Sequence, residues 1–554
     1  MRNKLILTAL LVVAGASLLA ASAMASGSAR HAKGAKGGTL TVLHLSSDFE
    51  YIDPQKCYDT GCGEVVWPIS YNLMQYAEKN GAEGKRIYPE AAAAMPVVSK
   101  DGKTYTFTVR KGVKASNGKV VTPQWFVRAF ERLLSPKMGD GASARFGGIS
   151  NFAAVVGAQA FYDGKASKIS GLSVSGDKFV IKLTKPFPSL LPGLAMSWFN
   201  ATDPATPYSE QDVNSVVSAG PYFISSREVG RNVVLDRNKN YKGTRPANAD
   251  RIIIPVNVDE NQGLLQVKAG QADYIGQTGV PGASAAGLGD EFGINKGRFW
   301  VLPTSVTTYW ALNSLPGAPL SSLKLRQSVN WAIDRPAQVR VSGKYAGRRT
   351  DQILPPAMPG FIANNSLYAY AGAKPEIAKK VAGNVSNVPA LRLLHRNSAT
   401  DGNRAQIMRY NLEQAGFKVK EETVPTSQLF SRSGDKKNGN YDIIRLGWQA
   451  DYADPVNFIN ILLDGRQIPD SGSSNNASFT NDPKFNKLMD QAATLSGDAR
   501  YAAFGNLDIQ MMKQVAPWAP LTNANNRFLV SARVKNFTYN QANTYVALNA
   551  LSVK

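Results

Sequence analysis

The spacing of apolar residues predicts a strand-rich segment in the first half of the chain. Aromatic and β-branched residues alternate with polar ones over 104–110, directly after an Asp-Gly turn, which predicts a hairpin strand. Apolar residues at helical spacing follow Thr122-Pro123, where a helix is predicted to begin. A further hairpin is predicted over 172–183. We expect the aromatic side chains of this segment to form its core and not a base-stacking platform.

The second half of the chain alternates between strand and helix patterns. The predicted elements are strands over 307–313, 391–394 and 417–420, and helices over 320–335 and 403–415. A first strand is predicted near the start of the mature chain, over 37–45. Strands that alternate with helices are typical of the α/β class.

One stretch, 441–458, combines a strand pattern with charged and aromatic side chains (YDIIRLGWQADYADPVNF). The apolar residues Ile443, Ile444 and Leu446 are typical of a short buried strand, and Gly447 permits the close approach of another backbone. Asp454-Pro455 then predicts the start of a helix, with Asp454 as a cap that an asparagine could also provide. Asp451 has no comparable local role.

Asp451 and Arg445 are therefore the candidate binding residues of this stretch. A carboxylate at the mouth of a strand suits a ligand ammonium group, and the earlier guanidinium group suits an anionic end of the same ligand. We expect the Asp451 carboxylate to be solvated until a ligand binds. The alternative is that Arg445 and Asp451 form a salt bridge with each other, or lie in a solvated loop.

The first residues predict export. Residues 1–25 have a basic start, an apolar run and small residues that fit cleavage after Ala23 or Ala25. The apolar run is short for a membrane span of ~20 residues, although an uncleaved anchor stays an alternative. No cysteine follows the run, so a lipid anchor is not expected. We expect a soluble, periplasmic or extracytoplasmic protein, with a disordered lead-in over 26–36.

The two cysteines are Cys57 and Cys62, and in an oxidising compartment they predict a local disulfide. A metal pair is the alternative, but the chain has only three scattered histidines, so neither a metal site nor a cofactor is expected. Roughly 530 residues remain after export, which is enough for two or three domains.

Charge and motifs narrow the function further. The net charge is +22, but the lysines and arginines are dispersed, so no nucleic-acid partner is expected. We expect a solvated basic surface that associates weakly with anionic envelope polymers. Common hydrolase and nucleotide-binding motifs are absent, and no enzymatic activity is expected, although carboxylate spacing alone leaves a secreted glycosidase open. Gly287, Gly289 and Gly293 miss the dinucleotide-binding spacing and predict a flexible turn.

The chain resembles the oligopeptide- and dipeptide-binding proteins of bacterial ABC importers, extracellular solute-binding protein family 5. The Gly-Trp-x-Ala-Asp-Tyr stretch at 447–452 matches the family's binding segment, in which the aspartate holds the α-amino group of the peptide. The DGKTYTFTVRKGV stretch from Asp101 and the SAGPY stretch from Ser218 are further landmarks. The resemblance covers about residues 37–554.

The resemblance implies an α/β, class II periplasmic-binding fold, with two lobes around a hinge and an extra small strand-rich domain in the N-terminal lobe. The implied boundaries are domain I at 37–88, 201–302 and 525–554, domain II at 89–200, and domain III at 303–524. The lobes would close about a hinge made by the crossings near 201–215 and 300–305 and by the C-terminal return of the chain. The implied partners are short peptides and the transmembrane subunits of a permease, and the protein is expected to be a monomer. Oligosaccharides, opines, haem and metal chelates are alternative solutes.

The resemblance also assigns roles to individual residues. Asp451 would fix the peptide amino terminus, and Arg445 would receive a carboxylate. Gly447 and Gln449 would pair with the peptide backbone. The remaining candidates are the pocket walls Trp448 and Tyr452, the loop residues Tyr58, Asp59 and Thr60 held by Cys57–Cys62, and the weaker wall candidates Tyr309 and Trp310.

Overall fold

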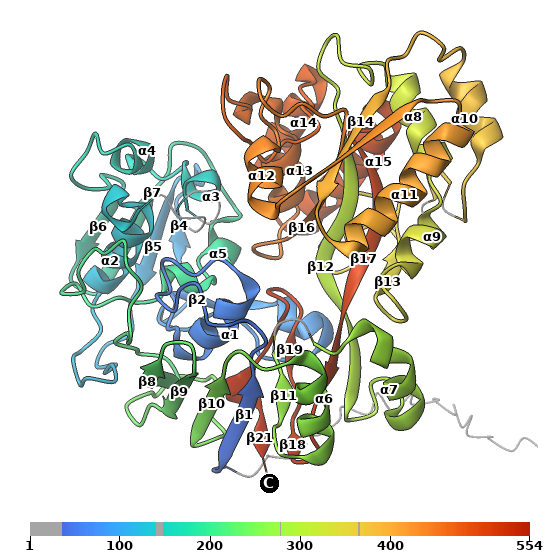
Figure 1. The fold of residues 1–554 in the computed structure, drawn as a ribbon. Coiled ribbons are helices and arrows are strands. Elements are labelled where there is room, and N and C mark those ends of the chain that lie inside the picture. The colour runs from blue at the N-terminus through green and yellow to red at the C-terminus, as the bar shows by residue number, and fades with distance from the viewer. Residues whose placement is uncertain are drawn as a thin grey trace, which may run out of the picture. The chain divides into compact units, whose positions relative to one another are not determined.

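Three β-sheets of four or more strands organise the chain in this computed structural model, which describes residues 36–139, 144, 148–276, 279–363, 366–369 and 371–553 (Figure 1). The predicted export segment and nearly all of the lead-in lie outside the described residues. Among the helices within them, none is long and apolar enough to cross a membrane.

The five-stranded sheet contains the first strand of the chain. Its order is β11 (Tyr274–Ile275), β1 (Thr39–Leu43), β10 (Arg251–Pro255), β9 (Asn232–Arg237) and β8 (Tyr222–Glu228). The helices α1 (Thr60–Ile69), α6 (Glu260–Ala269) and α7 (Ala285–Phe292) accompany it. The prediction of a strand near residue 40 is confirmed.

Helix α7 corrects the prediction of a flexible turn, because Gly287 and Gly289 lie within it. Ala285 and Leu288 of this helix are buried in a cluster with Phe299 and Leu529. Packing of this apolar face outweighs the low helix propensity of glycine.

The four-stranded sheet confirms the hairpins predicted in the first half. Its order is β4 (Val97–Val98), β5 (Thr104–Thr108), β7 (Lys178–Lys182) and β6 (Leu172–Ser175). Helix α2 (Pro123–Leu134) begins where predicted and packs aromatic residues against this sheet, with the Phe126 and Phe179 ring centroids 6.2 Å apart. Short helices α3 (Ser150–Phe152), α4 (Ala158–Tyr162) and α5 (Leu190–Gly193) complete the segment.

The six-stranded sheet carries the predicted binding stretch. Its order is β13 (Gly347–Arg349), β17 (Trp518–Leu529), β12 (Phe299–Leu312), β16 (Ile443–Gln449), β14 (Leu391–Arg396) and β15 (Val419–Val424). The helices of this half are α8 (Leu323–Ala332), α9 (Arg335–Arg340), α10 (Pro375–Ala382), α11 (Ala399–Gln414), α12 (Thr426–Arg432), α13 (Val456–Leu463), α14 (Pro483–Thr494) and α15 (Gly497–Gln514).

The helix predicted over 320–335 is divided into two. Helix α8 ends at Ala332, and Asp334 caps α9 by accepting a hydrogen bond from the backbone N–H of Ala337 at 2.9 Å. A proline follows Arg335 at the start of α9, which suits the first turn of a new helix better than the interior of an old one.

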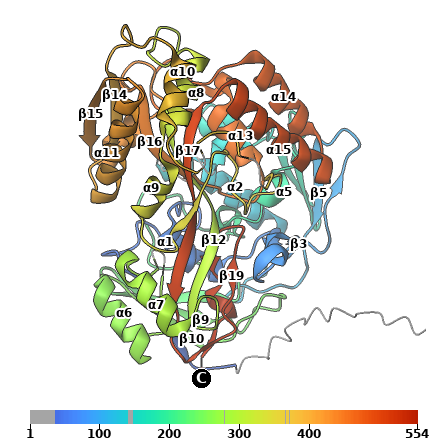
Figure 2. The same ribbon diagram turned by 90° about the vertical axis from the view of Figure 1, so that its right-hand side faces the viewer.

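Strands β12 and β17 pair along most of their length and join two hydrophobic clusters. Phe299 and Leu529, at one end, pack with residues of the five-stranded sheet, whereas Tyr309 and Trp518, at the other end, pack beneath the helices of the six-stranded sheet. Figures 1 and 2 show the two strands running from the level of α6 and α7 to the level of α8. Their register is irregular between Pro303 and Thr307.

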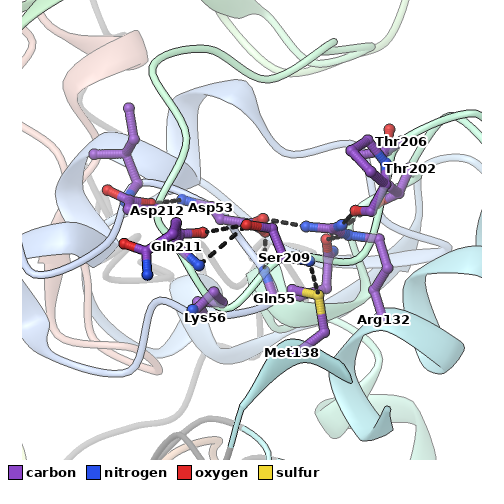
Figure 3. A network of polar contacts seen from close by, with 12 residues as sticks. Asp53, Gln55, Lys56, Arg132, Met138, Thr202, Thr206, Ser209, Gln211 and Asp212 are labelled. Atoms are coloured by element: carbon purple, nitrogen blue, oxygen red, sulfur yellow. Dashed lines mark hydrogen bonds and ion pairs between the residues drawn. The ribbon is translucent and has the colours of Figure 1, made fainter. Parts of the chain in front are cut away.

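A network of polar contacts ties the chain segment after residue 201 to its surroundings (Figure 3). Arg132 of α2 forms a buried ion pair with Asp53 and donates a hydrogen bond to Gln55 at 3.2 Å. Asp212 accepts from the backbone N–H of Asp53 at 3.3 Å. The charged groups at the centre of this network have partners within the protein, which indicates a structural role.

Candidate functional site

The predicted disulfide between Cys57 and Cys62 is present and lies at the start of α1. Asp59 caps this helix by accepting from the backbone N–H of Gly61 at 2.6 Å and of Cys62 at 3.0 Å, and Thr60 is its first residue. The loop therefore has a fixed shape. It presents the Tyr58 ring, which stacks on Trp198 with centroids 5.7 Å apart.

Three neutral side chains from distant parts of the chain donate to the Asp451 carboxylate. The Tyr58 hydroxyl donates at 3.0 Å, the Asn457 amide at 2.9 Å and the Asn151 amide at 3.4 Å. None of the described lysines and arginines forms an ion pair with Asp451. The carboxylate is thus held in place without a compensating charge from the described protein.

The Asp451 side chain is half-buried, so it is less solvated than the sequence-based expectation. Burial raises the pKa of the Asp451 carboxyl to about 6, although its hydrogen bonds from Asn457, Tyr58 and Asn151 act in the opposite direction. Burial and the neighbouring Asp451 also raise the pKa of Tyr58, which therefore stays protonated and donates. The Asp451 carboxyl is therefore a half-buried anion near neutral pH.

Asn457 and Asn151 are functional candidates that the sequence patterns did not reveal. Asn457 lies in the first turn of α13, and its Oδ1 also accepts from the Asp451 backbone N–H at 2.9 Å and from the Trp448 indole at 3.1 Å. Asn457 and Asn460 are the two polar residues of the otherwise apolar α13, and this was the available signal for Asn457. Asn151 is 300 residues away from Asp451, and its sequence neighbourhood gives no signal.

Trp448 and Tyr58 belong to a cavity of about 560 Å³ that also includes Tyr309 and Gly447. We call it the aromatic cavity; its apolar and aromatic walls are Tyr58, Tyr309, Phe430, Leu446, Trp448 and Leu462, and serines supply most of its polar groups. Two of its lining residues connect the cavity to Asp451. Tyr58 donates to Asp451 directly, and Trp448 donates to Asn457, which donates to Asp451. The predicted wall residues Trp448 and Tyr309 and the predicted loop residue Tyr58 are therefore brought together.

Two of the predicted wall residues point elsewhere. Trp310 follows Tyr309 on β12 and is buried in the hydrophobic cluster on the other face of the sheet, because successive side chains of a strand alternate. Tyr452 is also fully buried, and its hydroxyl donates to Asn151 at 2.9 Å. Tyr452 thus orients a hydrogen-bond donor to Asp451 and does not line the aromatic cavity.

Strand β16 offers a free backbone edge beside this cavity. It pairs with β12 along its whole length, whereas β14 pairs with it only at Ile443 and Ile444. Beyond Ile444 no described strand occupies that side, and this part includes Gly447 and Gln449. Gly447 is exposed, so an extended ligand backbone has access there.

Arg445 does not pair with Asp451, so the alternative of a direct salt bridge between them is wrong. It is buried, and its guanidinium group lies 3.7 Å from Asp401 and donates to the Tyr309 carbonyl at 3.3 Å. Burial, together with the nearby Arg404, lowers the pKa of Arg445 to about 9. Arg445 lines a second cavity, of about 350 Å³, on the side of Gly447 and Gln449.

The described residues contain no group of three or more histidine, cysteine, aspartate or glutamate side chains placed to hold a metal ion. The buried His395 instead lies 3.0 Å from Glu421. The polar groups that surround Asp451 are amides and hydroxyls, which suit hydrogen bonding to an ammonium ligand or to the carboxylate itself.

The arrangement corresponds to the class II periplasmic-binding fold, an α/β fold with an additional strand-rich segment in its N-terminal part. Residues 86–470 match the family described as bacterial extracellular solute-binding proteins, family 5. The match covers more than half of the chain, and the chain belongs to this family.

The curated relatives and solved structures agree with this assignment. The probable D,D-dipeptide-binding periplasmic protein DdpA of Escherichia coli K12 is 25% identical, over 90% of this chain and 92% of its own. The oligopeptide-binding protein OppA of Bacillus subtilis 168 is 25% identical, over 83% of each chain. The structure of clavulanic acid biosynthesis oligopeptide binding protein 2 has a TM-score of 0.85 at 20% identity, covering 94% of this chain and 96% of that one.

Proposed function

We propose that this chain is the exported solute-binding component of an ABC importer and captures short peptides by their amino terminus. The observation that carries the proposal is the Asp451 carboxylate, which three neutral donors hold and no described cation neutralises. A peptide ammonium group would supply that charge, and charge-assisted hydrogen bonds are the strong ones. The names of the relatives above, which bind dipeptides or oligopeptides, support the same ligand class.

The free edge of β16 supports an extended ligand. Backbone groups of Gly447 and Gln449 would pair with the peptide as an added strand would, so that affinity depends little on its side chains. Tyr58 and Trp448 would enclose the first residues of the ligand, and the site near Arg445 would receive an anionic group.

Capture would involve closure of two lobes, with domains I and II in one and domain III in the other. The continuous strands β12 and β17 and the crossing near 201–215 are the proposed hinge, because few chain segments would need to bend there. The closed, monomeric protein would act outside the cytoplasm and deliver its ligand to the permease subunits. No step of this cycle requires catalysis by the chain.

The test is a thermal-shift series with the mature protein and mixed di- to pentapeptides. Peptides with a free amino terminus should raise the melting temperature, because ligand stabilises only the folded form to which it binds. N-acetylated versions of the same peptides are the matched control and should give a smaller shift. If a sugar or metal chelate shifts the melting temperature and no peptide does, the peptide assignment is wrong and only the transporter class stands.

A further inference from the structure

The aromatic cavity and the cavity beside Arg445 share a wall but differ in charge. Phe430, Leu446 and Gly447 line both of them. The described lining of the aromatic cavity contains no charged side chain, whereas three arginines and one aspartate line the other. We call the second one the cationic cavity. A ligand that extends along the free edge of β16 would meet both environments in turn.

The aromatic cavity is the one linked to Asp451. Tyr58 lines it and donates to Asp451, and Trp448 lines it and donates to Asn457, which in turn donates to Asp451. Phe430 of α12 adds a large ring that is 57% exposed. An apolar or aromatic side chain close to the ligand ammonium group would cover these rings, whereas a charged one would lose its hydration without gaining a partner.

The cationic cavity holds three guanidinium groups around a single carboxylate. Nε of Arg396 lies 2.8 Å from Asp401, and the nearest guanidinium nitrogens of Arg404 and Arg445 lie 3.8 Å and 3.7 Å from it. The aspartate and the last two arginines are buried. Their charges leave an excess of two positive charges at the cavity wall.

The hydrogen bonds of this cluster are also incomplete. Nε of Arg445 and Oδ1 of Asp401 are buried and lie 3.7 Å apart, so they attract each other as an ion pair but are too far apart for a hydrogen bond, and neither has another hydrogen-bond partner among the described residues. Asp401 lies in the first turn of α11, whose amino-terminal end contributes further positive potential. Buried excess charge is costly, and an anionic ligand group with free lone pairs would offset that cost.

We propose that the chain selects ligands of opposed polarity, with an apolar or aromatic side chain next to the ammonium group and an anionic group further along. This inference rests on the proposed function and names the substrate class of the same site. Arg396, Arg404 and Arg445 together recognise the anion, and Phe430 contributes to the choice of the apolar side chain. The competing interpretation is that the arginine cluster only fastens β14, α11 and β16 together.

Calorimetric titration of the mature protein with three tripeptide amides tests the inference. Phe-Gly-Glu amide carries the apolar group and one anion, Phe-Gly-Gln amide lacks the anion, and Gly-Gly-Glu amide lacks the apolar side chain. We expect the first to bind at least tenfold more tightly than either of the others, since each of the others leaves one cavity unmatched.

Two substitutions, each with a matched control substitution, localise the preference. Arg396→Gln should reduce the preference for the Glu peptide over the Gln peptide at least fivefold; its side chain is 43% exposed, and Asp401 keeps two other arginines. Arg409→Gln changes the same charge on an exposed part of α11 and should leave the preference unchanged. Phe430→Ala should reduce the preference for the Phe peptide over the Gly peptide, whereas Tyr410→Ala, at another exposed ring, should not.

The outcomes separate the two proposals. Binding of all three peptides with equal affinity would overturn the opposed-polarity inference and leave peptide capture in place. The inference is likewise overturned if Arg396→Gln and Arg409→Gln change the Glu preference equally, because the effect would then be one of general surface charge. If the native protein binds none of the three peptides, nor any peptide of a mixed library, both proposals fail together.

Discussion

Two aspartates three residues apart, the half-buried Asp451 and the buried Asp454, have opposite surroundings. Asp454 receives two hydrogen bonds from the buried Arg500, at 2.9 and 3.3 Å, and one from the backbone N–H of Val456. Asp451 receives hydrogen bonds only from neutral side chains. A buried charge with an ion-pair partner stabilises the fold. A carboxylate that is hydrogen-bonded but has no cationic partner can instead bind a cationic group of a ligand.

The partners of each aspartate also differ in what they connect. Arg500 donates to Ser189 at 2.8 Å as well as to Asp454, so this pair joins α15 to the segment after the four-stranded sheet. The donors to Asp451 converge on one carboxylate from the loop before α1, from α3 and from α13. The first arrangement is a structural link, and the second is the proposed binding site, built where separate segments meet.

The largest expected effect comes from breaking the structural pair. Asp454→Asn should lower the free energy of unfolding by about 3–5 kcal/mol, because it leaves the Arg500 charge buried and unpaired. This corrects the sequence-based view of Asp454 as a cap that asparagine could replace. Urea unfolding measures the change.

Asp482→Asn is the matched control for this substitution. Asp482 caps α14 through the backbone N–H groups of Lys484 and Phe485 and has no ion pair among the described residues. Asparagine caps helices about as well as aspartate, so this variant should unfold within about 0.5 kcal/mol of the native chain. Equal losses in the two variants would show that Asp454 acts as a cap alone.

The second prediction uses the pH dependence of Asp451. Peptide affinity should fall about tenfold for each pH unit below 6, because protonation of a carboxyl whose pKa is about 6 removes the charge that binds the ammonium group. Titration of one peptide between pH 4.5 and pH 7 measures this. Asp451→Asn should show a flat profile over that range, and an equally steep profile in the variant would place the titrating group elsewhere.

The effect of Asp451 ionisation on the free energy of unfolding is opposite to its effect on peptide affinity. The unfolded-state pKa of an aspartate is about 3.9, so a folded-state value near 6 means that ionisation of Asp451 costs stability. The stabilising contribution of the protonated form is complete below about pH 4 and is lost as the pH rises through 6. Ionised Asp451 therefore lowers the free energy of unfolding at neutral pH, which fits a role in binding rather than in stability.

The smallest effect is expected from reducing the disulfide. Cys57 and Cys62 close a very short loop, so the loss on reduction should be less than the ~3 kcal/mol expected for a 15-residue loop. The helix cap by Asp59 remains in the reduced chain and keeps part of the loop geometry. Unfolding with and without a reductant gives the difference, and a similar comparison of peptide affinity shows how far the bond shapes the Tyr58 side of the site.

Sequence patterns predicted the local parts of this molecule well. The hairpins around β5 and β7, helix α2 and strand β16 follow from periodicity and turn residues that act over a few positions. Helix α7 was missed because its stability comes from distant packing partners and not from its glycine-rich sequence.

In the candidate site, too, the sequence predicted local features and missed contacts between distant segments. The stretch around Asp451 is recognisable by itself, and Cys57–Cys62 follows from cysteine spacing and compartment. Asn151, by contrast, reaches Asp451 only through tertiary folding, and the Arg445–Asp401 contact joins β16 to α11. Side-chain direction on a strand also decided which of Tyr309 and Trp310 lines the cavity, and the sequence did not distinguish them.

The most direct test of the Asp451 assignment is a thermodynamic cycle of Asp451→Asn against N-acetylation of a tripeptide. In the native chain, acetylation should weaken binding of trialanine by ~2–5 kcal/mol, because the Asp451 carboxylate, buried once the lobes close on the ligand, loses the ammonium group. In Asp451→Asn, the free and acetylated peptides should bind within a factor of about three of each other. An equal penalty for acetylation in both proteins would contradict the account, because Asp451 would then not be the group that recognises the peptide amino terminus.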